Sequence, residues 1–189
     1  GTGTGKTLAY LVPLLAHLEQ GGQHRAVVST YSRALQAQIL EGDLPRLTRG
    51  GEGVLARRLM GRRNYLCLRQ RRAYLTRPLE EPREALKTAA LRLWLLATGE
   101  GLRDELVRHP LLAEDLRPLF ASAQPCTPEC WEGDGCFVVR ARRRAREAQL
   151  VVVNHALLLS DQDADGALIG PYDLAVVDEA HRLPGAALE

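Results

Sequence analysis

Long apolar runs, lysine and cysteine are all scarce in this sequence of 189 residues. No run of eighteen apolar residues occurs, so we expect no membrane-spanning helix. The sequence opens on a glycine-rich loop instead of the basic and apolar regions of a signal peptide, and we therefore expect a cytoplasmic protein. Only four cysteines are present, which in such a protein favours a metal site over a disulfide framework.

The basic residues are almost all arginine, and they are clustered. Lysine supplies 2 of the 25 basic residues, while seven arginines and no acid lie between Arg57 and Arg72. Five more arginines fall between Arg140 and Arg146, and the segment from Pro78 to Cys136 holds 11 acids against 6 bases. Two basic blocks around an acidic insert indicate a surface that binds a polyanion, although solvated helix faces would give the same pattern.

The first seven residues, GTGTGKT, match the end of a phosphate-binding loop of the form G-x-x-x-x-G-K-[ST]. The pattern's first glycine would precede Gly1, so we expect the chain to be a fragment that begins inside the motif. Glycines let backbone N–H groups approach phosphate oxygens, and the helix that follows adds its positive end. We therefore expect ATP at this loop, with Lys6 on the β- and γ-phosphates and Thr7 on Mg²⁺; the alternative is a flexible glycine-rich terminus. The expected nucleotide-binding residues are Gly1, Thr2, Gly3, Thr4, Gly5, Lys6 and Thr7.

Apolar periodicity predicts an α/β fold built on a parallel sheet. Residues 6–20 have the spacing of a helix, residues 25–30 that of a buried strand, and residues 31–40 again that of a helix. A short strand is expected within 54–60, and further strands at 150–154 and 173–178. Residues 61–148 form an insert, whose pattern from residue 77 to about residue 120 is helical and is broken repeatedly by proline and glycine. The sequence thus predicts an α/β domain that is interrupted by a helical insert.

An acid pair follows the apolar run Leu174–Val177, which we interpret as a central strand. The carboxyl end of such a strand faces bound phosphates in parallel sheets. Asp178 is therefore expected to hold Mg²⁺, and Glu179 to orient or deprotonate the attacking water. The expected catalytic residues are Lys6, Asp178 and Glu179.

The four cysteines all fall within the insert. Cys67, Cys126, Cys130 and Cys136 are separated by 58, 3 and 5 residues. Four thiolates suit a [4Fe–4S] cluster, while Cys126 and Cys130 form a pair of the kind found in zinc sites. Spacing alone leaves iron–sulfur and zinc both open.

The sequence resembles the superfamily 2 helicases, and more narrowly the DinG/XPD group of iron–sulfur DNA helicases. The resemblance is carried by stretches in the family's order: Gly1–Thr7 (motif I), Val28–Thr30 with Leu35 and Gln36 (motif Ia), Gly61–Cys67, Val151–Leu158, and the DEAH sequence Asp178–His181 (motif II).

This resemblance implies a RecA-like P-loop lobe and an ATP-dependent 5′→3′ DNA helicase that acts in repair or replication. It implies residues 1–60 as the first part of the lobe, 61–148 as an inserted [4Fe–4S] domain on the four cysteines, and 149–189 as the return to the lobe. It also gives His181 a coupling role. The second RecA-like lobe and the later motifs are expected beyond Glu189.

The expected partners are single-stranded DNA and DNA junctions, with no membrane. The arginine clusters would form a basic rim for the strand, and motif Ia would touch its backbone. The residues assigned to DNA binding are Thr30, Gln36, Arg62, Arg63, Arg142, Arg143 and Arg144. Two alternatives stay open: a metal-cluster nucleic-acid-binding module that is gated by ATP and does not unwind, and a DEAH-type RNA helicase with a zinc insert.

Overall fold

The structure, a computed structural model, describes residues 5–20, 23–48, 53–107, 116–120, 126, 130 and 135–186. The chain divides into two compact units, each described by itself. The first unit comprises residues 1–60 and 142–189, and the second comprises residues 61–141. The helix α8 (Phe137–Glu147) begins in the second unit and ends in the first.

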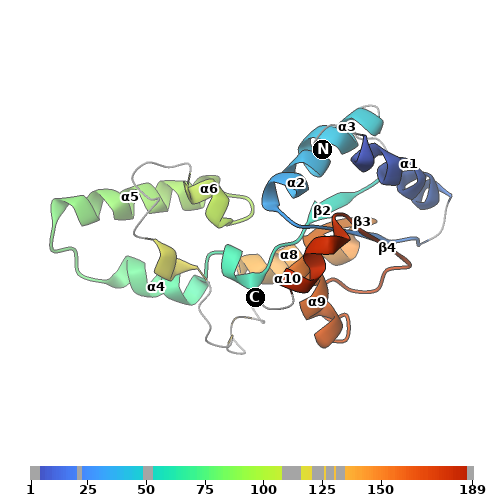
Figure 1. Ribbon diagram of the computed structural model, residues 1–189. Coiled ribbons are helices and arrows are strands. Elements are labelled where there is room, and N and C mark those ends of the chain that lie inside the picture. Colours follow the sequence, from blue (N-terminus) through green and yellow to red (C-terminus); the bar gives the residue numbers. More distant parts are fainter. Residues whose placement is uncertain are drawn as a thin grey trace. The chain divides into compact units, whose positions relative to one another are not determined.

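A parallel sheet of four strands forms the centre of the first unit (Figure 1). Its strands are β1 (Ala26–Thr30), β2 (Ala56–Arg58), β3 (Leu150–Asn154) and β4 (Leu174–Val177), in the order β2-β3-β1-β4. In register, Val28 lies beside Val152 of β3 and Val176 of β4. β-Branched residues fit such a pleated, buried surface, which is why these short apolar runs become strands. The predicted α/β class with a parallel sheet is confirmed.

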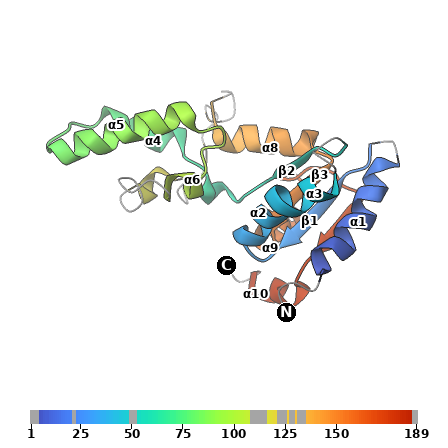
Figure 2. The ribbon, with the colours of Figure 1, turned by 90° about the horizontal axis from the view of Figure 1, so that it is seen from above.

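Helices cover both faces of this sheet (Figures 1 and 2). On one face lie α1 (Lys6–Glu19), α2 (Arg33–Ala37), the π-helix η1 (Gln38–Asp43) and α3 (Leu44–Leu47). Leu11, Leu14, Leu15 and Leu18 of α1 are buried there against Ala26, Val28, Leu150 and Val152. On the other face lies α9 (His155–Asp163), and the short η4 (Ala180–Arg182) and α10 (Leu183–Ala186) follow β4. The apolar stripe of α1 thus anchors the helix that follows the phosphate-binding loop.

The second unit is helical. It contains η2 (Arg62–Asn64), α4 (Leu68–Thr76), α5 (Pro82–Ala97), α6 (Arg103–Val107), η3 (Arg117–Leu119) and the start of α8. Two antiparallel bridges, Tyr65 with Leu102 and Leu66 with Phe120, join segments far apart in sequence. Gly101 has a positive φ of 66° and lies against the ring of Phe137, where a Cβ would come within 2.4 Å of the ring carbon Cγ. Close packing of this loop on α8 therefore depends on that glycine.

Two expectations about elements were wrong. β4 is an edge strand among the described strands, not a central one, and its residues are only partly buried or exposed. The predicted helix over residues 31–40 divides into α2 and the π-helix η1, which runs on to Asp43. No described helix is long and apolar enough to span a membrane.

Candidate nucleotide site and cysteine cluster

The end of the phosphate-binding loop leads directly into α1. Gly5 precedes the helix in a left-handed conformation, with φ 73° and ψ 11°, and its carbonyl accepts the first helical hydrogen bond from Ala9 at 3.0 Å. Only glycine adopts this conformation without strain, which explains its place before the helix. Lys6 is exposed and Thr7 is half-buried in the first turn, where free backbone N–H groups favour an anion. The expected ligands Gly1, Thr2, Gly3 and Thr4 lie outside the described residues.

Asp178 lies at the carboxyl end of β4, on the sheet edge that the start of α1 also approaches. Its backbone N–H donates to the Ser29 carbonyl at 2.9 Å, which ties the residue to the end of β1. Its carboxylate oxygen Oδ2 accepts a hydrogen bond from the Tyr10 hydroxyl at 3.3 Å. Two segments separated by 168 residues therefore meet at this carboxylate.

Tyr10 joins the two expected Mg²⁺ ligands. Burial, with the charge of Asp178 as the next cause, raises the pKa of Tyr10, while a hydrogen bond with the Thr7 side chain opposes that rise. The hydroxyl is therefore a protonated donor at neutral pH. One phenol thus contacts both Thr7 and Asp178, which places the end of the loop beside the acid. Tyr10 was missed from sequence; its signal is its spacing, three residues after Thr7 and one helical turn along the same face.

The residue after Asp178 has an unusual backbone. Glu179 is one of two non-glycine residues with positive φ among the described residues, at φ 51° and ψ 46°. Such a conformation costs of order 1 kcal/mol and tends to occur where a side chain must be aimed at a site. Glu179 and His181 are both exposed, and the Glu179 carbonyl accepts from Arg182 N at 2.8 Å.

A buried histidine lies beneath this turn. His155, 1% exposed, makes a 2.7 Å hydrogen bond through Nδ1 with the Ser29 hydroxyl. Its other ring nitrogen faces the backbone of Asp178 and Glu179 without a hydrogen bond of normal geometry. Burial lowers the pKa of His155, despite the opposing effect of the nearby acid segment, so the ring is neutral. Ser29 and His155 together connect the ends of β1 and β3 to the acid turn.

The two motif Ia residues assigned to DNA are not exposed. Thr30 and Gln36 are both 0% exposed, and the Thr30 hydroxyl donates to the Ser32 carbonyl at 3.2 Å. Neither polar atom of the Gln36 amide has a partner among the described residues. Both side chains are therefore covered in this structure.

The arginines assigned to DNA lie in two places. Arg62 and Arg63 are in η2 of the second unit, Arg62 half-buried and Arg63 exposed. Arg142, Arg143 and Arg144 lie on α8 in the first unit, and the last two are exposed. Each set presents positive charge at a surface.

None of the four cysteines forms a disulfide, and contacts within the second unit link the segments of Cys67, Cys126 and Cys136. Arg62 donates from Nη1 to the Cys126 sulfur at 3.4 Å. Cys67 donates its N–H to the Leu119 carbonyl at 2.8 Å, and Gly135, beside Cys136, lies against Leu68, beside Cys67.

In the described part of the chain, the four sulfurs do not form a group of ligand atoms within 4.8 Å of one another, as a single ion requires. A cubane cluster holds its thiolates on separate iron corners, farther apart than around one ion. The free thiols, the cationic donor and the converging segments fit such a cluster.

Comparison with known proteins agrees with these features. Residues 1–58 match the DEAD/DEAH box helicase family. The chain is 40% identical over 97% of its length to the ATP-dependent helicase DinG of Mycobacterium tuberculosis (strain ATCC 25177 / H37Ra), of which it covers 30%. It is 38% identical to the ATP-dependent DNA helicase YoaA of Escherichia coli (strain K12), over 99% of the chain and 30% of YoaA. It is 34% identical to DinG of the same strain, over 98% of the chain and 28% of that protein.

The chain thus spans about 30% of the length of the curated relatives it matches. The resemblance inferred from the motifs is confirmed: the chain carries a DEAD/DEAH box helicase match at its N-terminal end and is similar, over almost its whole length, to one segment of the DinG and YoaA helicases.

Proposed function

We propose that the first unit is part of the ATP-hydrolysing motor of a DNA helicase. The observation that carries the proposal is the meeting of Thr7 and Asp178 at the Tyr10 hydroxyl. Residues 1–7 bind the phosphates of ATP, and Lys6 neutralises the β- and γ-phosphates. Thr7 and Asp178 hold Mg²⁺, which when bound stabilises negative charge on the transferring phosphoryl group. Glu179 orients the attacking water, and His181 carries the state of the site to the rest of the motor.

The motor acts on single-stranded DNA in this proposal. A second RecA-like lobe closes on the nucleotide, and hydrolysis reopens the pair, so that the strand moves in the 5′→3′ direction. Arg62, Arg63, Arg142, Arg143 and Arg144 contact the strand's phosphates, with Thr30 and Gln36 joining after motion of α2. Junctions that arise in DNA repair or replication are the substrates. The names of the relatives support an ATP-dependent DNA helicase, while direction, translocation and pathway are our extension.

We propose further that residues 61–148 are an inserted iron–sulfur domain between residues 1–60 and 149–189 of the motor lobe. Cys67, Cys126, Cys130 and Cys136 hold a [4Fe–4S] cluster, supported by the free thiols and the Arg62 donor. The complete protein, purified without oxygen, is expected to contain about four irons and four sulfides per chain. Replacing Cys136 with serine should remove most of both, and a Thr127→Ala control should keep them. Zinc in place of iron and sulfide would overturn this assignment.

The helicase proposal is tested with the complete protein on duplexes that carry a single-stranded tail. ATP hydrolysis should rise with single-stranded DNA, and strands should separate when the tail is 5′ but not when it is 3′. Lys6→Ala should abolish both activities while leaving much of the DNA binding, since the loop lysine acts on the nucleotide. ATP-gated DNA binding without strand separation would contradict the motor. A preference for strands with 2′-hydroxyls would indicate an RNA helicase instead.

A further inference from the structure

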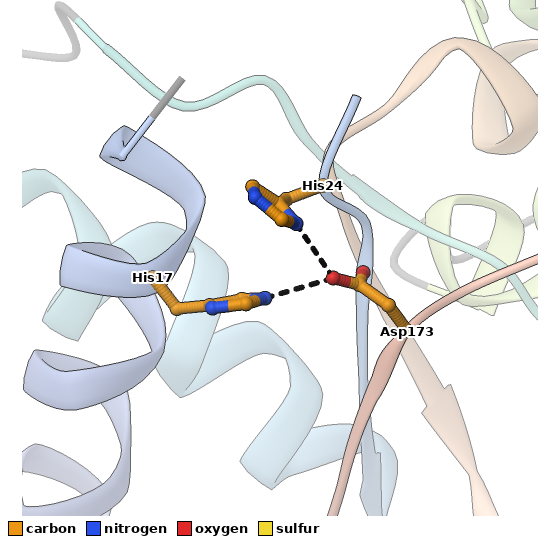
Figure 3. Close-up of side chains that lie close together, drawn as sticks. All are labelled: His17, His24 and Asp173. Carbon is orange, nitrogen blue, oxygen red and sulfur yellow. Dashed lines mark hydrogen bonds and ion pairs between the residues drawn. The ribbon is translucent and has the colours of Figure 1, made fainter. Parts of the chain in front are cut away.

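Three side chains that the nucleotide site does not use meet at the opposite edge of the sheet (Figure 3). His17 lies in the last turn of α1, His24 just before β1, and Asp173 just before β4. Because β1 and β4 are parallel, their starts share one edge, and Asp178 lies at the other. This group, His17, His24 and Asp173, is called the imidazole–carboxylate triad below.

The triad is compact and open to solvent. The distance from Asp173 Oδ2 is 2.8 Å to His17 Nε2 and 2.7 Å to His24 Nδ1, and all three atoms lie within 4.8 Å of one another. The imidazole rings are 4.4 Å apart between centroids and tilted by 48°. The side chains are 33%, 36% and 42% exposed, so an ion can enter from solution.

The carboxylate is oriented by backbone rather than by flexible side chains. Asp173 Oδ1 accepts from the Arg25 N–H at 2.7 Å, and Asp173 N donates to the Arg25 carbonyl at 3.0 Å. These bonds turn Oδ2 toward both imidazoles (Figure 3). Bonds of this kind behind a ligand typically raise metal affinity by fixing the ligand's direction.

The donor set suits one divalent metal class. Two imidazole nitrogens and one carboxylate oxygen, with a position left for water, form a common zinc site. Tetrahedral bonds of roughly 2.0–2.1 Å would place the ligand atoms about 3.3 Å apart. The two nitrogens must therefore move outward from the carboxylate oxygen by about half an ångström, which exposed imidazoles can do by side-chain rotation.

We propose that His17, His24 and Asp173 bind a Zn²⁺ ion that fastens the end of α1 to the starts of β1 and β4. The ion takes the place of the protons on His17 Nε2 and His24 Nδ1, which pass to the other ring nitrogen or to water. The elements that it joins, α1 and β4, carry Thr7 and lead into Asp178 at their other ends, so zinc would also restrain the nucleotide site. The inference does not rest on the proposed function, because it uses no residue of that site.

The test measures Zn²⁺ binding to the complete protein by equilibrium dialysis and metal counting. The cysteines can also take zinc, so each variant is compared with the unchanged protein prepared in parallel. The double variant His17→Gln/His24→Gln should bind one zinc fewer per chain, and Asp173→Asn should raise the dissociation constant at least about tenfold. Glu19→Gln removes an exposed carboxylate from the same helix and should change neither value.

A second measurement needs no substitution. Zn²⁺ should protect His17 and His24 from carbethoxylation by diethylpyrocarbonate, read by mass spectrometry, while the exposed His181 continues to react. Equal zinc counts and affinities in all variants, or modification of His17 and His24 undiminished by zinc, would overturn the site. The protection result decides the matter if a variant fails to fold.

Discussion

At the scale of single residues, the proposed nucleotide site depends on the Tyr10 hydroxyl and the carboxylate that it contacts. Tyr10 is one turn from Thr7 and donates to Asp178 Oδ2, which fixes the direction of that carboxylate oxygen. Its raised pKa keeps the phenol protonated, and the contact persists at neutral pH. The donor that positions Asp178 is thus a neutral hydroxyl.

Tyr10→Phe tests this positioning. The hydrogen bond that is lost is long, so its loss should cost about 1 kcal/mol. That free energy corresponds to a roughly fivefold rise in the Mg²⁺ concentration that gives half-maximal ATP hydrolysis. The maximal rate should change less, because no reacting atom is removed. The control is Tyr31→Phe, since Tyr31 is 49% exposed and its ring lies by Arg182. An unchanged Mg²⁺ requirement in Tyr10→Phe would rule out the positioning role.

At the scale of elements, the end of β1 and the start of α9 support the acid turn. The Ser29 carbonyl accepts a hydrogen bond from the Asp178 N–H, and the Ser29 hydroxyl is hydrogen-bonded to Nδ1 of the buried His155. These bonds tie the end of β1 and the start of α9 to the turn that carries Asp178 and Glu179.

Ser29→Ala leaves His155 Nδ1 buried and unpaired. That should cost about 1–3 kcal/mol of local stability, so amide hydrogens of β1 and of Asp178 should exchange roughly 5- to 150-fold faster in the complete protein. Ser160→Ala is the matched control, because its hydroxyl bonds to the Ala156 carbonyl on the exposed side of α9. Exchange rates at β1 that match those of the control would show that the Ser29–His155 pair stabilises nothing.

The arginines of α8 can be tested through the salt dependence of DNA binding. If Arg142, Arg143 and Arg144 each contact one phosphate of a single strand, replacing all three with alanine should flatten the slope of log affinity against log salt by about 2. Arg83→Ala/Arg92→Ala removes exposed charge from α5 and should leave the slope unchanged. A triple variant with the original slope would exclude these arginines from the strand's path.

The sequence predicted the elements that local pattern determines. The leucine spacing of α1 and the β-branched runs of β1 and β3 carry their own structure, and their bounds agree with prediction within a residue or two. The helix α4 was not predicted, because its arginines and glutamine leave too few apolar residues to show helical spacing. The π-helix, the edge position of β4 and the burial of Gln36 depend on tertiary packing, which no local pattern reports.

Some residues of the candidate site could be predicted from local sequence, and others could not. The glycine-rich loop, its lysine and the acid pair are recognisable by residue type and spacing, so the sequence predicts Lys6, Thr7, Asp178 and Glu179. Tyr10, Ser29 and the imidazole–carboxylate triad are assembled from segments 126 to 168 residues apart, and only the fold brings them together.

At the scale of the whole molecule, the central claim is that the loop ending in Lys6 and Thr7 and the acid Asp178 act on one nucleotide. The chain spans about 30% of the length of its relatives, so this claim must be tested on the complete protein. When two groups act as one catalytic unit, removing both lowers the rate little more than removing one. When two groups act independently, the two rate losses multiply.

The most direct test is therefore single-turnover ATP hydrolysis by the complete protein and by Lys6→Ala, Asp178→Asn and the double variant. Each single change should slow hydrolysis at least about 100-fold, and the double should fall less than about tenfold below the slower single. Losses that multiply to about 10⁴, or a single variant that keeps most of its rate, would contradict a shared site.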